Sequence, residues 1–309
     1  MVLGRVAASF YTAISVTIFY LILREIDELK KFRSDRWIYL FIFFYAFGTN
    51  IYSIASRSLW QHTSSLLLIS VIIFFMLKSI NNDKYVKWMG FFAGLLYLSR
   101  PLNIIFIFIL SVYVFIKYKK YFLQYILYAL PFIIFLIVYN TYAWGEPFTS
   151  EYVVKGNTQF STPILEGLAG NLFSPARSFI FISPPLAISF YGMFLALKKK
   201  KKDKLDAISF ILAITFIIIF FVYSKWWCWY GADRFGYGFF TEWVPLVSIF
   251  TYIIIKPKGN FIKILFTLSL IWSVHAQFNA VWYRKSRCGP DHNWSFYCLK
   301  PLIFSKQEY

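Results

Sequence analysis

The fold class is decided by residues 205–223, LDAISFILAITFIIIFFVY, an apolar run about as long as the 20 or so residues that a helix needs to cross a membrane. Runs of this kind recur along the chain, and hydrophobic residues make up 59% of its 309 positions, more than soluble domains carry. The runs are too long, and alternate too little, for the strands of a transmembrane β-barrel. The sequence therefore predicts an all-α fold, a polytopic bundle of transmembrane helices.

We predict about ten transmembrane helices in one domain covering residues 1–309. The predicted helices occupy residues 4–24, 36–56, 60–78, 86–99, 102–117, 121–140, 178–197, 205–223, 241–256 and 260–277. The fourth and fifth are short and are separated only by Ser99-Arg100-Pro101, so they form either two helices or one broken helix. The first helix has no cleavage site of small residues after it and is interpreted as a retained helix.

The net charge of +18 is distributed unevenly between alternate loops. Twenty of the 32 lysines and arginines lie in five short loops, at residues 24–36, 78–87, 117–120, 198–204 and 256–263. By the positive-inside rule these loops are cytoplasmic, so the charge indicates a membrane anchor beside anionic lipids and not a nucleic-acid site. The N-terminus, the 141–177 loop and the 278–309 tail then share the outer face.

Metal and redox chemistry have little support in the sequence. Cys228, Cys288 and Cys298 are the only cysteines, and none of them pairs with another at the spacing of a zinc site. Cys288 and Cys298 share the outer tail, where they form either a disulfide or two free thiols. We predict no metal and no cofactor, and the chain contains no nucleotide-binding motif.

The densest aromatic stretch is KWWCWYGADRFGYGFFTEWVP, residues 225–245, which follows directly after the apolar run described first. An interfacial girdle of rings accounts for many of its aromatic side chains, but not for the adjacent opposite charges of Asp233 and Arg234. We expect both charges in an outer-facing cleft, because facing lipid would be costly. The rings expected to form its wall are those of Trp226, Trp227, Trp229 and Tyr230.

Other polar residues fall at predicted outer helix ends. Arg57 belongs to an interfacial belt or to the site, and His62 faces either a polar cavity or the interface. Arg100 stands before a proline, where it binds either a lipid headgroup or a substrate phosphate.

The 141–177 loop is punctuated by glycines and prolines, and we expect a short interfacial helix within it at 163–172. Arg177 follows at the start of the next transmembrane helix, where we expect it to help Arg100 hold a substrate phosphate. The Pro184-Pro185 pair of that helix predicts a kink beside a lined groove.

Five motifs occur in an order that resembles GT-C type glycosyltransferases, the bacterial relatives of dolichyl-phosphate-mannose protein mannosyltransferases. They are SRSLWQH (56–62), GLLYLSRPLNIIF (94–106), WGEPFTSEY (144–152), GLAGNLFSPARSFIFISPP (167–185) and WWCWYGADRFGYGFFTEWVP (226–245). The resemblance implies a multi-pass protein of the bacterial cell membrane. Such an enzyme takes a sugar from a polyprenyl-phosphate donor and transfers it to a lipid, glycan or protein acceptor on the outer side.

The resemblance also implies a set of site residues. Tryptophans 226, 227 and 229 match the aromatic part of the last motif, and Glu151 and Tyr152 fall in the third motif, where we expect substrate contacts. Two departures stand out. The family's G-P-R arginine falls on Gly238, so that Arg234 is the substitute we expect, and the family's first helix and first outer loop, with its catalytic carboxylate, are not matched.

Three functions are compatible with these features. The first is a glycosyltransferase, either divergent or a fragment of a longer enzyme, and the second is a non-catalytic protein that binds a lipid carrier. A transporter of lipid-linked sugar has less support, because we find no inverted repeat. For the enzyme, we expect Asp233 to be the general base, because among the outer carboxylates it alone has a basic neighbour and an aromatic wall. The carboxylates compared are Glu146, Glu151, Glu166, Asp233 and Asp291.

Overall fold

The computed structural model describes residues 2–33, 36–149, 159–199, 203–231, 235–287 and 293–294, with side chains of residues 282–287 excepted. All regular elements in these ranges are helices, as predicted. The α-helices are α1 (Val2–Lys30), α2 (Trp37–Phe47), α3 (Gln61–Asn81), α4 (Val86–Ser99), α5 (Ile104–Lys117), α6 (Phe122–Trp144), α8 (Ile164–Phe173), α9 (Phe179–Ile182), α10 (Pro184–Lys198), α11 (Lys204–Lys225), α12 (Val244–Ile255) and α13 (Asn260–Arg287). A π-helical turn, η1 (Ile51–Ala55), and 3₁₀ turns η2 (Asp83–Tyr85), η3 (Pro101–Asn103), η4 (Lys119–Tyr121) and η5 (Gly238–Trp243) connect them.

Among the described residues, six helical segments are long and apolar enough to cross a membrane. They are Val2–Lys30, Gln61–Asn81, Lys119–Trp144, Lys204–Lys225, Gly238–Ile255 and Asn260–Val281. The chain is thus a multi-pass membrane protein, although the predicted number of ten spanning helices stays a prediction. Large apolar side chains such as Phe108 and Phe261 are about two-thirds exposed, as expected for surfaces that face lipid.

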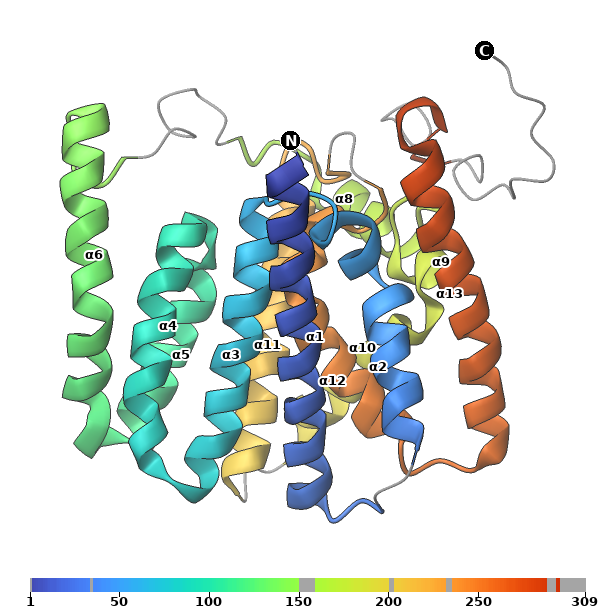
Figure 1. Cartoon of the computed structure of the whole chain (residues 1–309), viewed down its shortest axis with the longest axis horizontal. Coiled ribbons are helices and arrows are strands. Elements are labelled where there is room, and N and C mark those ends of the chain that lie inside the picture. The colour runs from blue at the N-terminus through green and yellow to red at the C-terminus, as the bar shows by residue number, and fades with distance from the viewer. Residues whose placement is uncertain are drawn as a thin grey trace.

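The helices run mainly side by side, with α6 at one edge of the bundle and α13 at the other (Figure 1). The described parts of the five basic loops lie at one end of the bundle, the lower end in Figure 1. There, Lys204 Nζ is 2.9 Å from the Asp83 carboxylate and also lies over the Tyr118 ring, while Lys256 Nζ is 3.5 Å from Asp27. We call this the basic end, and the opposite one the outer end, after the topology that the charge distribution predicts.

The two short helices α4 and α5 form a hairpin, which resolves the alternative that the sequence left open. Asp83, just before α4, and Tyr118, just after α5, both contact Lys204 at the basic end. The turn between them therefore lies toward the outer end, and Arg100 is the extended residue at which α4 stops.

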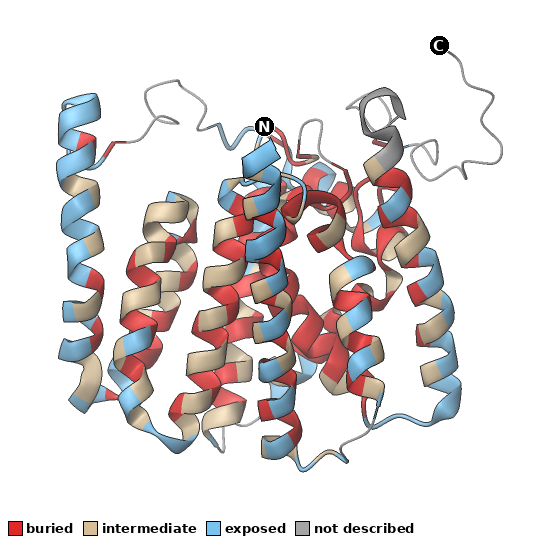
Figure 2. Cartoon of the chain, viewed as in Figure 1, coloured by how far each residue is buried: buried red, intermediate tan, exposed pale blue. Residues whose placement is uncertain are grey.

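Helix α6 packs closely against α4 because two glycines of α4 face it. A Cβ atom added to Gly90 would lie 2.0 Å from the Tyr125 carbonyl oxygen, and one added to Gly94 would lie 2.9 Å from that of Ala129. Small residues four apart allow this close backbone approach between membrane helices. Elsewhere α6 is mostly exposed, and it covers the edge of the bundle (Figure 2).

Three predicted helices have different boundaries in the structure. The helix predicted at 178–197 is two helices, because the backbone of Ser183 is not helical (φ −138°, ψ 70°) and Pro184 begins α10, a first-turn position that suits a residue without an N–H group. The double proline thus starts a helix instead of kinking one. The segment predicted at 36–56 stops at Phe47 and continues as a π-helical turn. Helix α13 extends to Arg287, so the outer tail starts later than residue 278.

The core is centred on α12 and the adjoining faces of α3, α10 and α11, and the ribbon in the middle of Figure 2 is mostly coloured as buried. Almost every residue from Gly238 to Ile255 is buried, so this segment is surrounded by protein. Any charged side chain on it must therefore find its partner inside the bundle.

Candidate functional site

A buried group of charged residues lies at the outer end of the bundle, where Glu242 contacts both His62 and Arg100. His62 Nδ1 lies against Glu242 Oε2, and the Arg100 guanidinium donates to Glu242 Oε1. The Tyr223 hydroxyl donates to the same oxygen at 3.0 Å, and its ring lies under Arg100 with 5.3 Å between guanidinium carbon and centroid. We call these four residues the outer cluster.

Each member of the outer cluster sits where a helix begins or ends. His62 is in the first turn of α3, Arg100 follows α4, Tyr223 is in the last turn of α11, and Glu242 is in η5 just before α12. Helix termini place these side chains at one depth of the bundle. The members come from four different helices or turns, and the His62–Glu242 contact spans 180 residues.

The turn that carries Arg100 is fixed by a set of neutral hydrogen bonds. The Asn103 amide donates to the Ser65 hydroxyl at 2.9 Å, and that hydroxyl lies 3.0 Å from the hydroxyl of Ser99. Ser64 contacts Ser99 as well, at 2.7 Å. These bonds tie the α4–α5 turn to the first turn of α3, and so hold Arg100 beside His62.

Burial separates the roles that the cluster residues can have. Glu242 is fully buried and His62 is 3% exposed, whereas the Arg100 side chain is 12% exposed. Since one carboxylate balances one guanidinium, the cluster has no net charge when His62 is neutral. Arg100 is the member that an outside ligand reaches first, and the others hold it in place.

The aromatic stretch at 225–245 packs over α8 at the outer end. Trp229 is buried against Gly170, and its indole N–H donates to Glu166 at 3.2 Å. Trp226 packs edge-on against Phe160, while Trp227 is 45% exposed. Helix α8 occupies the range in which the sequence predicts a short helix, and the aromatic rings cover it.

Arg177 is only 1% exposed and is held between two other outer segments. Its Nε donates to the Asn293 side chain at 2.7 Å, and its guanidinium carbon lies 5.9 Å from the centroid of the Tyr230 ring. The Ser174 hydroxyl donates to the Asn293 backbone carbonyl. Arg177 thus links the turn after α8 to residue 293, and its contact with a substrate phosphate stays a prediction.

A second polar network connects the aromatic stretch to α13. The Gln277 amide donates to Asn50 at 3.2 Å, and the Ser53 hydroxyl donates to Gln277 at 2.5 Å. Tyr237 donates to the Ser183 hydroxyl at 2.7 Å, and burial raises the pKa of Tyr237 so that this phenol stays protonated. The network includes the π-helical turn η1, a type of irregularity that is frequent at functional sites.

The structure brings together two of the predicted site residues, His62 and Arg100, and places Arg57 on the surface, outside the cluster. Several predicted residues lie outside the described part of the chain. They are Glu151, Tyr152, Asp233, Arg234, Asp291, Cys288 and Cys298. Within the described ranges, no group of three or more His, Cys, Asp or Glu side chains is arranged to hold a metal ion.

Glu242 is not among the site residues that the sequence predicts, because it stands inside an apolar run that is typical of a transmembrane helix. A signal was available: a carboxylate at membrane depth needs a partner, and His62 and Arg100 were basic residues predicted at the same end.

No protein-family model, curated protein or solved structure matches this chain.

Proposed function

We propose that the chain is a membrane glycosyltransferase of the GT-C type. It would transfer a sugar from a polyprenyl-phosphate donor to a lipid, glycan or protein acceptor at the outer face of a bacterial cell membrane. The observation that carries the proposal is the contact of Glu242 with both Arg100 and His62 at the outer end of the bundle. Ionisable residues at membrane depth are costly, and where they occur they commonly mark a substrate pathway.

In this proposal Arg100 binds the donor phosphate. A guanidinium is a planar fork of N–H donors that matches phosphate oxygens, and the contact with Glu242 holds this one in place. Glu242 is a positioning residue, because its full burial keeps it from the substrate while it fixes the arginine. The aromatic stretch supplies flat apolar faces for the sugar and the prenyl chain.

The general base of the proposed reaction is Asp233, which would take the proton of the acceptor hydroxyl as the sugar is transferred. It lies between Gly231 and Phe235, whose backbone the structure describes. The Phe235 carbonyl accepts from Asn50 at 3.5 Å. The second polar network therefore ties one flank of this segment to the bundle.

A turnover assay that does not require the acceptor to be identified tests the proposal. The purified protein is incubated in membrane nanodiscs with a panel of polyprenyl-phosphate hexoses and pentoses and crude acceptor extract, and released polyprenyl phosphate is followed by mass spectrometry. We expect release by the wild type and a loss of at least about 100-fold for Arg100→Gln, the scale of losing a charged contact in a transition state. Arg57→Gln, which removes an exposed arginine outside the cluster, is the matched control and should keep its activity.

Asp233→Asn should abolish release but keep donor binding. Donor binding without release in the wild type would favour the second candidate, a protein that binds the lipid carrier without catalysis. A wild type that neither binds polyprenyl phosphate nor releases it would exclude both.

A further inference from the structure

The basic end contains a cavity that the proposed glycosyl transfer does not use. It has a volume of about 650 Å³ and lies where the ends of α1, α2, α12 and α13 meet. Its lining comprises Lys31, Phe32, Arg33, Arg36, Lys256, Pro257, Lys258 and Lys263. Six of these eight residues are basic and none is acidic.

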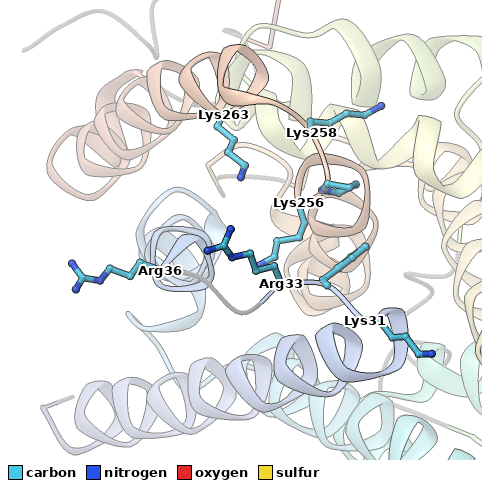
Figure 3. Close-up of a pocket in the computed structure, with 8 residues that line it drawn as sticks. Lys31, Arg33, Arg36, Lys256, Lys258 and Lys263 are labelled. Carbon is cyan, nitrogen blue, oxygen red and sulfur yellow. The ribbon is translucent and has the colours of Figure 1, made fainter.

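The backbone turns sharply to form one wall of this cavity. Lys31 ends α1 in the left-handed region, with φ of 53°, and the Phe32 N–H then donates to the Asp27 carbonyl at 2.9 Å. This turn brings Arg33 back beside the α12–α13 connection. In Figure 3 the charged ends of Arg33, Lys256 and Lys263 converge, whereas those of Arg36 and Lys258 extend away from them.

The acidic groups around the cavity balance little of this charge. Asp27 pairs with Lys256 at 3.5 Å and accepts from Tyr252 at 2.8 Å. Asp35, in the same loop as Arg33, lies outside the described residues. The lining thus has six cations and no carboxylate of its own, and Asp27 pairs with one of these cations, an excess of positive charge that favours a multiply charged anion as the ligand.

Two helix N-termini add to the preference for an anion. Arg36 is the N-cap residue of α2 and makes no side-chain capping bond, and Lys263 is in the first turn of α13. Neither helix has an acidic residue in its first turn. Cations at N-termini oppose the helix dipole unless an anion lies between them, and N-terminal N–H groups are themselves anion ligands.

The surface next to the cavity is apolar, which favours a lipid over a free anion. On α13, the side chains of Phe261, Ile264 and Leu268 are all more than half exposed. Trp37 packs beneath Lys263, with 5.4 Å from Nζ to the ring centroid, at the depth where tryptophan marks a membrane interface. Acyl chains have a surface to follow directly from the basic cavity.

We propose that this cavity binds the phosphate-bearing headgroup of an anionic phospholipid in the leaflet at the basic end, with its acyl chains along α13. Arg33 and Lys263 are the principal phosphate ligands, supported by Lys256. The proposal is independent of the glycosyl transfer at the outer end.

The test titrates three probes into the detergent-solubilised protein: phosphatidylglycerol, phosphatidylcholine and soluble inorganic pyrophosphate. Native mass spectrometry counts bound lipid, and thermal unfolding reports affinity. We expect phosphatidylglycerol to bind and phosphatidylcholine not to bind. The double variant Arg33→Gln/Lys263→Gln should weaken phosphatidylglycerol binding about 30-fold, since each basic residue near a membrane surface contributes about 1 kcal/mol.

The matched control is Lys84→Gln/Lys119→Gln, which removes two exposed charges from basic loops outside the lining of the cavity. We expect this control to bind phosphatidylglycerol less than about threefold more weakly than the wild type, because exposed charges are screened by salt. Equal losses of phosphatidylglycerol affinity in the two double variants would mean that the lipid is attracted to the basic surface as a whole, and would overturn the proposal of a site in this cavity. Pyrophosphate binding as tight as that of phosphatidylglycerol would overturn the lipid assignment. If the double variant does not fold, the single substitutions carry the same test, with about fivefold loss each.

Discussion

The two ends of the bundle treat charge in opposite ways. At the outer end, Glu242 is fully buried and shares its carboxylate among Arg100, His62 and Tyr223. At the basic end, six cations line one cavity and most of them reach solvent. The difference follows from the surroundings, because charge inside the bundle must be balanced within the protein, whereas charge at the membrane surface can be balanced by lipid headgroups. Loss of charge should thus affect stability at the outer end and lipid binding at the basic end.

The largest effect is expected for Glu242→Gln. This substitution keeps the size of the side chain but removes the fully buried carboxylate that pairs with Arg100 and contacts His62, at a cost of about 3–5 kcal/mol in unfolding free energy. Glu166→Gln, which alters an exposed carboxylate at the same end, should change stability by less than about 0.5 kcal/mol. Thermal or denaturant unfolding in micelles measures both, and equal costs would contradict the assignment of the outer cluster.

A double-mutant cycle sharpens this prediction. Arg100→Gln alone should destabilise the protein, but Arg100→Gln with Glu242→Gln should cost less than the two single changes together, because no unpaired charge remains. Additive costs would mean that the two side chains do not interact.

A steric change at the outer end should cost less than loss of the carboxylate. A Cβ atom at Gly167 would lie 1.8 Å from the Ser224 carbonyl oxygen, so Gly167→Ala must push α8 away from α11. We expect this to lower the free energy of unfolding by about 1–3 kcal/mol. Gly4 has no heavy atom within 4 Å of the same added atom, and Gly4→Ala should be neutral or slightly stabilising. Unfolding curves of the two alanine variants check the difference.

At the basic end, burial should distinguish one lysine from the others. Lys256 is 5% exposed and pairs with Asp27, so Lys256→Gln leaves a buried carboxylate with less support and should cost about 1–3 kcal/mol. Lys258 is exposed, and Lys258→Gln should change the free energy of unfolding by less than about 0.5 kcal/mol. If the two variants lose the same free energy of unfolding, Lys256 contributes no more to stability than an exposed surface lysine.

The smallest effect is expected for the exposed ion pair between Lys204 and Asp83. Both side chains are partly exposed, and such pairs contribute about 0–1 kcal/mol. Lys204→Gln should therefore shift the unfolding midpoint only slightly at low salt and not at all at high salt. A large loss that persists in high salt would contradict this view.

The sequence was sufficient to predict the membrane class and which residues share an end of the bundle. Run length predicts spanning helices, and basic loops predict sidedness, so His62 and Arg100 could be placed at one end before any contact was known. It could not show that Glu242 joins them, because the contacts span 180 and 142 residues and depend on which helices are neighbours. The broken helix at Ser183 was missed for a local reason: two prolines can begin a helix as well as kink one.

The most direct test of the contrast between the two ends is a comparison of two ligands on two variants. Polyprenyl phosphate and phosphatidylglycerol are titrated separately into Arg100→Gln and into Arg33→Gln/Lys263→Gln, and thermal unfolding reports binding. We predict that Arg100→Gln loses the shift caused by polyprenyl phosphate and keeps that caused by phosphatidylglycerol, and that the double variant shows the reverse. If either variant loses the unfolding shifts of both ligands, or keeps the shifts of both, the two ends do not bind separate ligands. That result would contradict the contrast between the two ends.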